Sequence, residues 1–504
     1  MKSAIGWAFA AVFLLAAAFT PAPDAAGAAP APVQIPASTS EADTALAPAP
    51  AAATSPAVGD WLGRLDVGPA VLRLALGVSE GEGGGLTAIL DSIDQGAEIP
   101  VDRARFEDGT LTLEIDAIGG SYRGDVNADG SAIEGTWTQR GQSRELTFQR
   151  QGEKFTLDRP QEPREPFPYA TRDVTFAGGD EGVELAGTLV VPAGKGPFPA
   201  LVFASGSGPQ DRDESLMGHR PFLVIADHLA RHGVASLRYD DRGFGESSGD
   251  HFGSTVGDFA DDLAAALATL RRQPEIDGSR VGVLGHSEGG LSAAKVAAAG
   301  APVDFLVLLA PPGVPLPELL QRQAGDIFRQ GGVAPGLVER ALAQQAGDLE
   351  LLRQDLSRDE LRRRLRQRAE SWLATMSVEE KEALGINDET LDQSVRQATT
   401  GWFLSLLRED PAAYLRRVQV PVLALFGGKD LQVDAESNAA AVRRALAAAD
   451  NPDHEVRVLP GLNHLFQSAE TGAVSEYGSI EETIAPKALE IVTTWIGERA
   501  GARS

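Results

Sequence analysis

The chain has 504 residues, more than one ordinary domain needs, so two or three domains are expected. Its 45 basic and 71 acidic residues give a net charge of −26. Nucleic acids and anionic membrane surfaces attract basic patches, so this charge disfavours both as partners. The chain has no cysteine, which excludes disulfides and lipid attachment through cysteine.

Residues 1–27 have the pattern of a secretory signal peptide. Lys2 supplies a positive start, residues 5–19 are apolar, and small residues follow at 24–29. The apolar run is shorter than the roughly 20 residues that a bilayer needs, which disfavours a membrane anchor. No other stretch is apolar enough to span a membrane. We therefore expect export to the periplasm or the medium, with the leader removed.

Residues 28–57 are almost all Ala, Pro, Ser and Thr, and we expect them to form a flexible linker. Residues 58–152 then alternate apolar and polar residues in short runs separated by glycine-containing turns. This period of two predicts a small antiparallel β domain, either a barrel or a curled sheet. Trp61 and Trp137 are interpreted as core aromatics rather than as a ligand platform. The domain contains no candidate catalytic cluster.

A proline-rich linker, 153–172, precedes a region in which apolar strands alternate with helical patterns. Several strands are continuous runs of Val, Leu and Ile, as in strands buried on both faces of a parallel sheet. The pattern predicts a doubly wound, mostly parallel eight-stranded α/β sheet. Its parts are 173–312 and 412–504, with strands expected at 173–176, 183–191, 200–204, 234–239, 280–284, 303–309, 422–426 and 455–459, and helices at 221–231, 259–271, after Ser287 and at 485–496.

Residues 313–411 interrupt this alternation with helical periodicity and no strand. We expect them to form a helical cap over the active site, with breaks between helices at 331–332 and at Gly385. The arginine-rich run 358–368 is interpreted as a solvated helix face with acid–base pairs, in preference to an anion site.

The strongest chemical signal is the sequence GHSEGG at 285–290, between a buried-strand run and an Ala-rich helical run. The G-x-S-x-G pattern places a serine on a sharp strand-to-helix turn, where flanking side chains would collide with the neighbouring strand and helix. Ser287 is therefore the candidate nucleophile. His286, its neighbour, is expected to point away from the site.

A serine nucleophile needs a base and a group that orients the base, and in this pattern they follow in the order serine, acid, histidine. Two histidines come after Ser287. His454 begins a predicted strand, whereas His464 lies in a loop after the last strand and is the candidate base. Asp430, at the end of the preceding strand, is the candidate acid, with Asp434 as the alternative.

The tetrahedral intermediate of acyl transfer needs two backbone N–H donors. Glu288, directly after the nucleophile, supplies one. The second is expected from the loop after the third strand of the sheet, from the amide of Ser207 or, as second choice, of Gly206. The charged run 211–213 is interpreted as holding this loop by ion pairs, although Arg212 could instead bind a substrate carboxylate.

No cofactor or metal is expected. The glycines of 239–249 miss the spacing of a nucleotide-binding loop, and no P-loop lysine follows. The seven histidines form no close histidine–carboxylate ligand set.

With these motifs, the chain from residue 173 onward resembles the α/β-hydrolase superfamily. The stretches GSGPQDRD (206–213) and GHSEGG (285–290) are similar to those of bacterial carboxylesterases with a small N-terminal domain and a helical cap. The resemblance implies hydrolysis of carboxylic esters with short acyl chains through an acyl-enzyme, with Ser287, Asp430 and His464 as the triad. The partner would be a small-molecule ester, and the oligomeric state is left open.

Two other functions remain as alternatives. A serine peptidase of the prolyl-oligopeptidase type has the same triad and a preceding β domain, but that domain is usually a propeller much larger than residues 58–150 can form. A noncatalytic binding protein on the same scaffold is disfavoured by the complete set of triad residues.

Overall fold

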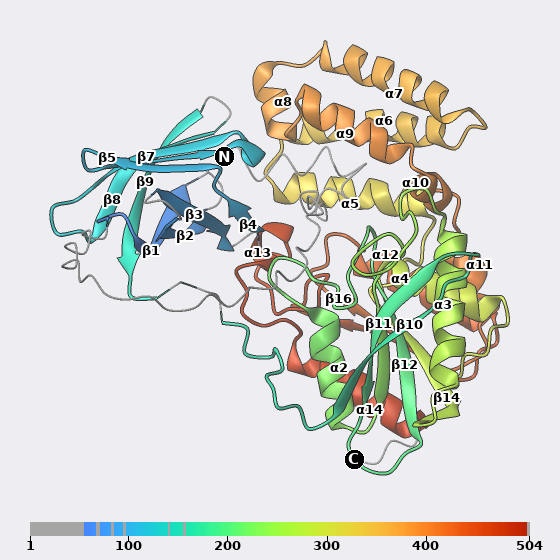
Figure 1. Ribbon diagram of the computed structural model, residues 1–504. Helices are drawn as coiled ribbons and strands as arrows, with labels where there is room; N and C mark the ends of the chain where they lie inside the picture. Colours follow the sequence, from blue (N-terminus) through green and yellow to red (C-terminus); the bar gives the residue numbers. More distant parts are fainter. Residues whose placement is uncertain are drawn as a thin grey trace, which may run out of the picture.

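The computed structural model describes residues 55–66, 71–81, 85–93, 97–139, 142–153, 155 and 158–500. The expected signal peptide and nearly all of the first linker lie outside these residues. Figure 1 shows a small all-β domain beside a larger α/β domain. None of the helices in the described ranges is both long and apolar enough to cross a membrane.

The N-terminal domain is a closed antiparallel barrel, which confirms the all-β prediction. Its sheet has the order β2-β1-β9-β8-β7-β6-β5-β3-β4, and an additional pairing of β2 with β3 closes it. Closure leaves few unpaired strand edges. The strands are β1 (Gly59–Asp66), β2 (Val71–Glu80), β3 (Leu86–Ser92), β4 (Ala97–Pro100), β5 (Arg103–Glu107), β6 (Thr110–Ile115), β7 (Gly120–Val126), β8 (Ala132–Gln139) and β9 (Gln142–Gln151).

The barrel is filled by aromatic and branched side chains, which alternate with less buried residues along strands such as β6 and β7. Trp61 and Trp137 are 1% and 3% exposed, as expected for core aromatics. Tyr122 packs edge-on against Phe148 at 5.1 Å between ring centroids, and its hydroxyl donates to backbone carbonyls of β8 and β9. The two tryptophans therefore serve the core and do not form a binding surface.

The α/β domain is built on an eight-stranded sheet in the order β10-β11-β13-β12-β14-β15-β16-β17. From β13 to β17 all neighbours are parallel, whereas β11 is antiparallel to both of its neighbours. Each of the eight expected strands is present. They are β10 (Ala170–Ala177), β11 (Glu184–Val191), β12 (Phe198–Ala204), β13 (Ala235–Tyr239), β14 (Ile276–His286), β15 (Leu306–Leu309), β16 (Val422–Gly427) and β17 (His454–Leu459).

Helices cover both faces of this sheet. Two of them, α2 (Pro221–Arg231) and α14 (Pro486–Ala500), pack against each other, and α3 (Val256–Arg271), α4 (Glu288–Ala298), α11 (Pro411–Leu415) and α12 (Ala435–Ala448) form a second group. Parallel register brings the carboxyl ends of the central strands together, since Ala204 pairs with Gly285 and His286 with Leu309. Loops from these ends meet at one edge, where ligands of open α/β sheets bind.

Between β15 and β16 the chain forms helices only. All but the last of them, α11, lie beyond the carboxyl edge of the sheet in Figure 1, with α5 nearest the sheet and α7 outermost. The expected breaks are present, because α5 ends before Gly331–Gly332 and α8 before Gly385, and Gly332 and Gly385 have positive φ. The helices are α5 (Leu316–Gln330), α6 (Pro335–Leu352), α7 (Arg358–Leu373), α8 (Val378–Leu384), α9 (Asp388–Ala398) and α10 (Gly401–Leu406).

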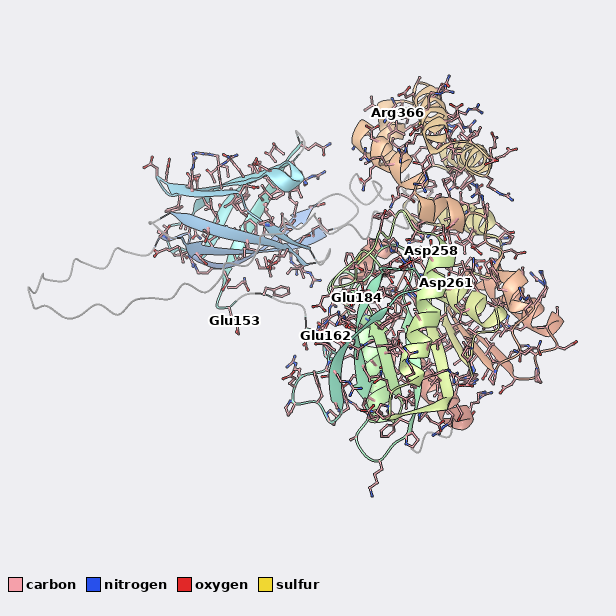
Figure 2. The ribbon with its side chains drawn as sticks, turned by 45° about the vertical axis from the view of Figure 1, so that its right-hand side comes forward. Glu153, Glu162, Glu184, Asp258, Asp261 and Arg366 are labelled. Atoms are coloured by element: carbon pink, nitrogen blue, oxygen red, sulfur yellow. The ribbon has the colours of Figure 1, made fainter. Side chains whose placement is uncertain are left out.

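The arginine-rich run lies on α7 and is an exposed helix face, as interpreted from the sequence. Arg363 and Arg364 both pair with Glu360 on the same helix. Arg366, labelled in Figure 2, lies on the outer side of the helical segment and pairs with Asp392. Because these charges are paired locally, the run does not form an anion site.

The proline-rich stretch before β10 differs from a simple linker because it docks on the α/β domain. Glu162, labelled in Figure 2, pairs with Arg220 at 2.6 Å just before α2. Gln161 bonds the backbone at 483 and 484. The guanidinium of Arg159 donates to the carbonyl oxygens of Met217, Gly218, Gly478 and Ile480.

Candidate active site

Ser287 lies at the point where β14 becomes α4. Its φ of 52° and ψ of −118° are strained for a residue with a side chain. A Cβ on Gly289 would collide with the carbonyl oxygen of Ala204, and a Cβ on Gly285 would collide with the backbone at Gly289. The two glycines therefore allow β12, β14 and α4 to approach closely enough to form the sharp turn that the motif predicts.

Asp430 and His464 are in contact. Nδ1 of His464 lies 2.7 Å from Oδ2 of Asp430, and the Asp430 side chain is fully buried. The other oxygen of Asp430 accepts the backbone N–H groups of Gln432 and Val433, each at 2.8 Å. The carboxylate is thus fixed by three hydrogen bonds, and it holds the imidazole by one nitrogen, which leaves Nε2 as the nitrogen available for proton transfer.

Asp434, the alternative acid, has a different position. Its carboxylate caps α12 by accepting the backbone N–H groups of Glu436 and Ser437. These hydrogen bonds lower the pKa of Asp434 in spite of the opposing effect of its burial. A helix-capping carboxylate is committed to the helix N-terminus, so the geometry favours Asp430 as the partner of His464. His454, the histidine that was set aside, begins β17 as expected.

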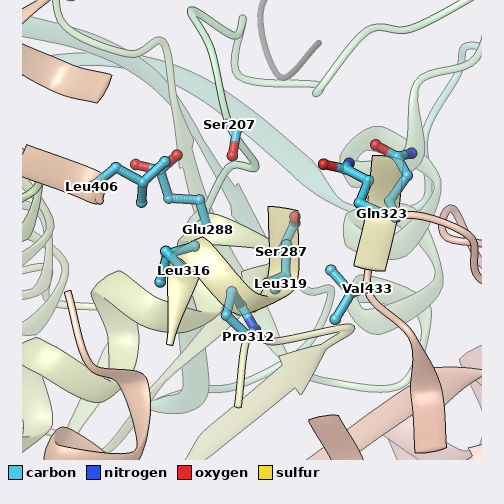
Figure 3. A pocket seen from close by; sticks show the side chains of 10 residues that line it. Ser207, Ser287, Glu288, Pro312, Leu316, Leu319, Gln323, Leu406 and Val433 are labelled. Carbon is cyan, nitrogen blue, oxygen red and sulfur yellow. The ribbon is translucent and has the colours of Figure 1, made fainter. Parts of the chain in front are cut away.

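A small cavity lies directly over Ser287 (Figure 3). Its open volume of about 20 Å³ is enough for roughly one water molecule. The floor comes from the sheet loops and the roof from helices α5 and α10. Ser207, Ser287, Glu288, Pro312, Leu316, Leu319, Gln323, Leu406, Gln432 and Val433 line it.

Ser207 and Glu288, the two expected backbone donors, both line this cavity. Glu288 is the first residue of α4, so its N–H is one of those that a helix leaves without an intrahelical acceptor. Gly206, the second choice, is excluded by its partner, because its N–H donates to Oε1 of Glu214 at 2.7 Å. The structure therefore favours Ser207 over Gly206 as the second donor.

The carboxyl group of Glu288 is buried at the wall of the same cavity. Nε1 of Trp402, on α10, donates to both of its oxygens at 2.9 and 3.2 Å, and the Ser207 hydroxyl is a further hydrogen-bond partner. Burial raises the pKa of Glu288 to about 7, although these hydrogen bonds favour the ionised form. Near neutral pH both the protonated and the ionised form of the Glu288 carboxyl group are therefore populated. Because Glu288 lines the cavity, this group can contact a bound ligand.

The charged run after β12 holds the loop, as interpreted from the sequence. Arg212 pairs with Asp240 at 2.7 Å and with Glu246 at 2.6 Å. Asp213 pairs with the buried Arg238 on β13. Arg212 is largely buried in these pairs and does not line the cavity.

His286 does not line the cavity, but it is not remote from His464. Its ring is buried, lies 4.7 Å from the His464 ring between centroids, and contacts both Glu214 and the His464 backbone. The G-x-S-x-G motif does not predict in which direction the His286 side chain points. Its partner Glu214 is 72 residues away in the sequence, so no local pattern reveals the contact. Among the described residues, no cluster of three or more His, Asp or Glu side chains could hold a metal ion.

Comparisons with known proteins find similarity to hydrolases. The family model described as "Serine aminopeptidase, S33" (Hydrolase_4) matches residues 220–470. Esterase EstD of Thermotoga maritima is 29% identical over 306 residues, which are 61% of this chain. The chain thus spans 62% of the length of that curated relative.

Similar solved structures include two esterases. Esterase Pf2001 of Pyrococcus furiosus has 16% identity and a TM-score of 0.38, with 66% of this chain and 94% of that chain covered. Est1E of Butyrivibrio proteoclasticus has 15% identity and a TM-score of 0.35, with 65% and 96% covered.

Proposed function

We propose that this chain is a serine esterase of the α/β-hydrolase superfamily, which cleaves carboxylic esters through an acyl-enzyme. The observation that carries the proposal is the cavity lined by Ser287, Ser207 and Glu288. Gln432 and Val433 also line it, and their N–H groups hold Asp430, the partner of His464. The similarity to an esterase supports hydrolysis of a small-molecule ester.

In the proposed first half-reaction, Oγ of Ser287 attacks the ester carbonyl carbon while Nε2 of His464 takes the hydroxyl proton. The carbonyl oxygen becomes an oxyanion and accepts the N–H groups of Ser207 and Glu288. The C–O bond then breaks, and the alcohol leaves with the proton from His464. Asp430 keeps the imidazole oriented and stabilises its positive charge throughout.

In the second half-reaction a water molecule attacks the acyl-enzyme, and His464 accepts its proton. The new tetrahedral intermediate uses the same two N–H donors. When it collapses, Ser287 leaves with the proton from His464, the carboxylic acid is released, and the free enzyme is restored.

The cavity supports short acyl chains as the preferred substrates. Its roof consists of Leu316 and Leu319 on α5 and Leu406 on α10, and its open volume is about 20 Å³. An apolar acyl group contacts such side chains favourably, but a long chain needs α5 to move or a side chain to be shortened. The helical segment 313–411 is thereby the proposed cap that sets substrate choice.

We also propose that the protein is exported. The support is the leader pattern of residues 1–27, which lie outside the described residues. Mass spectrometry of the exported protein should find its N-terminus at a position from 24 to 30. An intact Met1 on a membrane-bound product would contradict export with cleavage.

A serine peptidase is the second candidate, because the matching family model carries an aminopeptidase description. The preceding domain is a single barrel and not a propeller, so nothing in it resembles the prolyl-oligopeptidase arrangement. A matched pair of substrates separates the two functions. We expect wild-type protein to hydrolyse p-nitrophenyl acetate and butyrate, and alanine p-nitroanilide with a free amino group only weakly. Faster cleavage of the anilide would favour the peptidase.

A further inference from the structure

Glu214 and His286 lie behind the cavity, outside the proposed catalytic groups, and they connect three loops. Glu214 belongs to the loop after β12, His286 ends β14 before Ser287, and His464 lies in the loop after β17. Glu214 and His286 are 4% and 6% exposed. Side chains this buried keep their polar atoms only when those atoms are hydrogen-bonded.

The hydrogen bonds around this pair run in one continuous chain. The N–H of Gly206 donates to Oε1 of Glu214 at 2.7 Å, and the same oxygen lies 2.9 Å from Nδ1 of His286. On the other side of the ring, Nε2 of His286 lies 3.1 Å from the backbone carbonyl oxygen of His464. The chain therefore links the residue before Ser207, the residue before Ser287 and His464 itself.

The partners determine where the protons of His286 lie. A backbone carbonyl oxygen only accepts hydrogen bonds, so Nε2 must carry a proton. The oxygens of an ionised Glu214 carboxylate can only accept, so Nδ1 must carry a proton as well. Both ring nitrogens then donate, which is possible only for the positively charged imidazolium.

The charged groups around the pair agree with this assignment. Burial alone would lower the pKa of His286, but the Glu214 carboxylate outweighs burial and the pKa is raised, with a smaller contribution from Asp430. Asp241, in the loop after β13, also faces Glu214. Burial raises the pKa of Asp241 well above its usual range, although the Ser205 hydroxyl and the Gln210 N–H donate to its carboxylate. The His464 ring is a further titratable neighbour of His286.

We propose that Glu214 and His286 are a charged positioning pair, which holds the Ser207 donor, the Ser287 turn and His464 in the arrangement that the esterase reaction needs. This inference rests on the proposed function. The pair touches no reacting atom. It acts by fixing the backbones of three loops, so its loss should lower kcat more than it raises KM.

The pair also gives the site a dependence on pH. A His whose pKa is raised by its partner contributes fully below the usual value of about 6.5, and this contribution is lost as the pH rises through the raised value. Deprotonation removes one of the two donated hydrogen bonds. Activity should therefore decline on the alkaline side as His286 loses its proton.

The test compares Glu214→Gln with wild type and with Glu162→Gln, a control in which the paired carboxylate lies on the linker and touches none of the three loop positions. We expect Glu214→Gln to lower kcat about 10- to 100-fold, as small misplacements of reacting groups do, with little change in KM. The alkaline limb of the pH–activity profile of this variant should move to lower pH. The reason is that the Glu214 carboxylate no longer opposes the effect of burial, which lowers the pKa of His286. Glu162→Gln should match wild type in both respects. An unshifted limb, or a kcat equal to that of the control, would overturn the proposal.

A second measurement does not depend on ester hydrolysis. In wild-type protein with isotope-labelled histidine, NMR should show both ring nitrogens of His286 protonated at neutral pH, with the signal assigned by its absence in His286→Gln. A neutral His286 would overturn the proposal. If wild type hydrolyses no ester while His286 is an imidazolium, the proposed function fails and the charged pair stands.

Discussion

Two aspartates that follow β16 have separate tasks in this structure. Asp430 holds the His464 ring, and Asp434 caps α12. We expect Asp430→Asn to lower kcat on the order of 10⁴-fold, because the imidazole loses its orientation and the stabilisation of its charge. Asp434→Asn should leave kcat unchanged and lower the free energy of unfolding by about 1 kcal/mol at most, since Asn also caps helices. Steady-state kinetics with thermal melts of both variants provide the check. A larger loss of kcat in Asp434→Asn would contradict the assignment.

Glu288 should make the stability of the protein depend on pH. A carboxyl group whose pKa is raised to about 7 in the fold, from its usual 4.5, stabilises the folded state most at low pH. That stabilisation is lost as the pH rises through about 7, and the loss is on the order of 3 kcal/mol if the full shift is realised. Glu288→Gln removes the titrating group. Melting temperatures from about pH 5 to about pH 8 should therefore fall less in the variant than in wild type, and equal falls would contradict the raised pKa.

At the residue scale, the sequence was most informative for the three proposed triad residues, because the G-x-S-x-G motif and the chain order serine, acid, histidine determine their positions. Ser287 is marked by flanking glycines, and Asp430 and His464 by their places after strands. The choice between Ser207 and Gly206 as the second backbone donor depended on a contact that the sequence does not show. The N–H of Gly206 donates to Glu214, eight residues further along the chain. The contact between Glu214 and His286 spans 72 residues and leaves no local pattern, so only the structure reveals it.

At the element scale, α5 forms the part of the roof that is in closest reach of a substrate. Leu319→Ala should enlarge the cavity and raise kcat/KM for longer acyl chains relative to acetate, because pocket contacts discriminate between substrates by differential transition-state binding. The matched control is Leu337→Ala on α6, which is equally buried but belongs to a separate cluster of apolar side chains.

Both substitutions should destabilise the fold by about 2–5 kcal/mol, as large-to-small core changes do. Only Leu319→Ala should change the order of preference on a p-nitrophenyl ester series from acetate to decanoate. The same change of preference in Leu337→Ala would show that a general loosening of the helices, and not the cavity wall, sets chain length.

The elements themselves were predictable because buried parallel strands are continuous apolar runs and helices have a period near 3.6 residues. All eight strands of the larger sheet fall where expected, and five of them end at the expected residue, but most of their starts differ. β10 starts at Ala170 and includes polar residues that pairing with β11 makes extended. β14 starts at Ile276, which pairs with Phe198 before a register shift. How the helices of 313–411 pack over the cavity depends on contacts between distant residues, such as Trp402 with Glu288.

At the scale of the whole molecule, the barrel contributes none of the proposed catalytic residues. Removing residues 58–150 should therefore leave measurable ester hydrolysis. The proline-rich linker is different, because Arg159 donates to the carbonyl oxygen of Met217, between β12 and α2, and to that of Gly478, directly after α13. A deletion that extends to residue 168 removes these bonds, each worth about 1.5–3 kcal/mol when the donor is charged. The longer deletion should melt at a clearly lower temperature.

The two deletions are compared by thermal melts and by the same short-chain esters. A barrel deletion that folds, as judged by circular dichroism, but hydrolyses none of the esters would contradict the division between the domains. It would mean that the barrel helps to complete the active site.

The central claim is that Ser287 is the nucleophile of an acyl transfer. The direct measurement is covalent labelling with a p-nitrophenyl alkylphosphonate, which transfers its phosphonyl group to an activated serine and releases p-nitrophenol. Peptide mass spectrometry should find one adduct, on the peptide that contains Ser287, with loss of ester hydrolysis in proportion to labelling. Folded Ser287→Ala should take up no label. An adduct on another residue, or ester hydrolysis that persists in Ser287→Ala, would contradict the account.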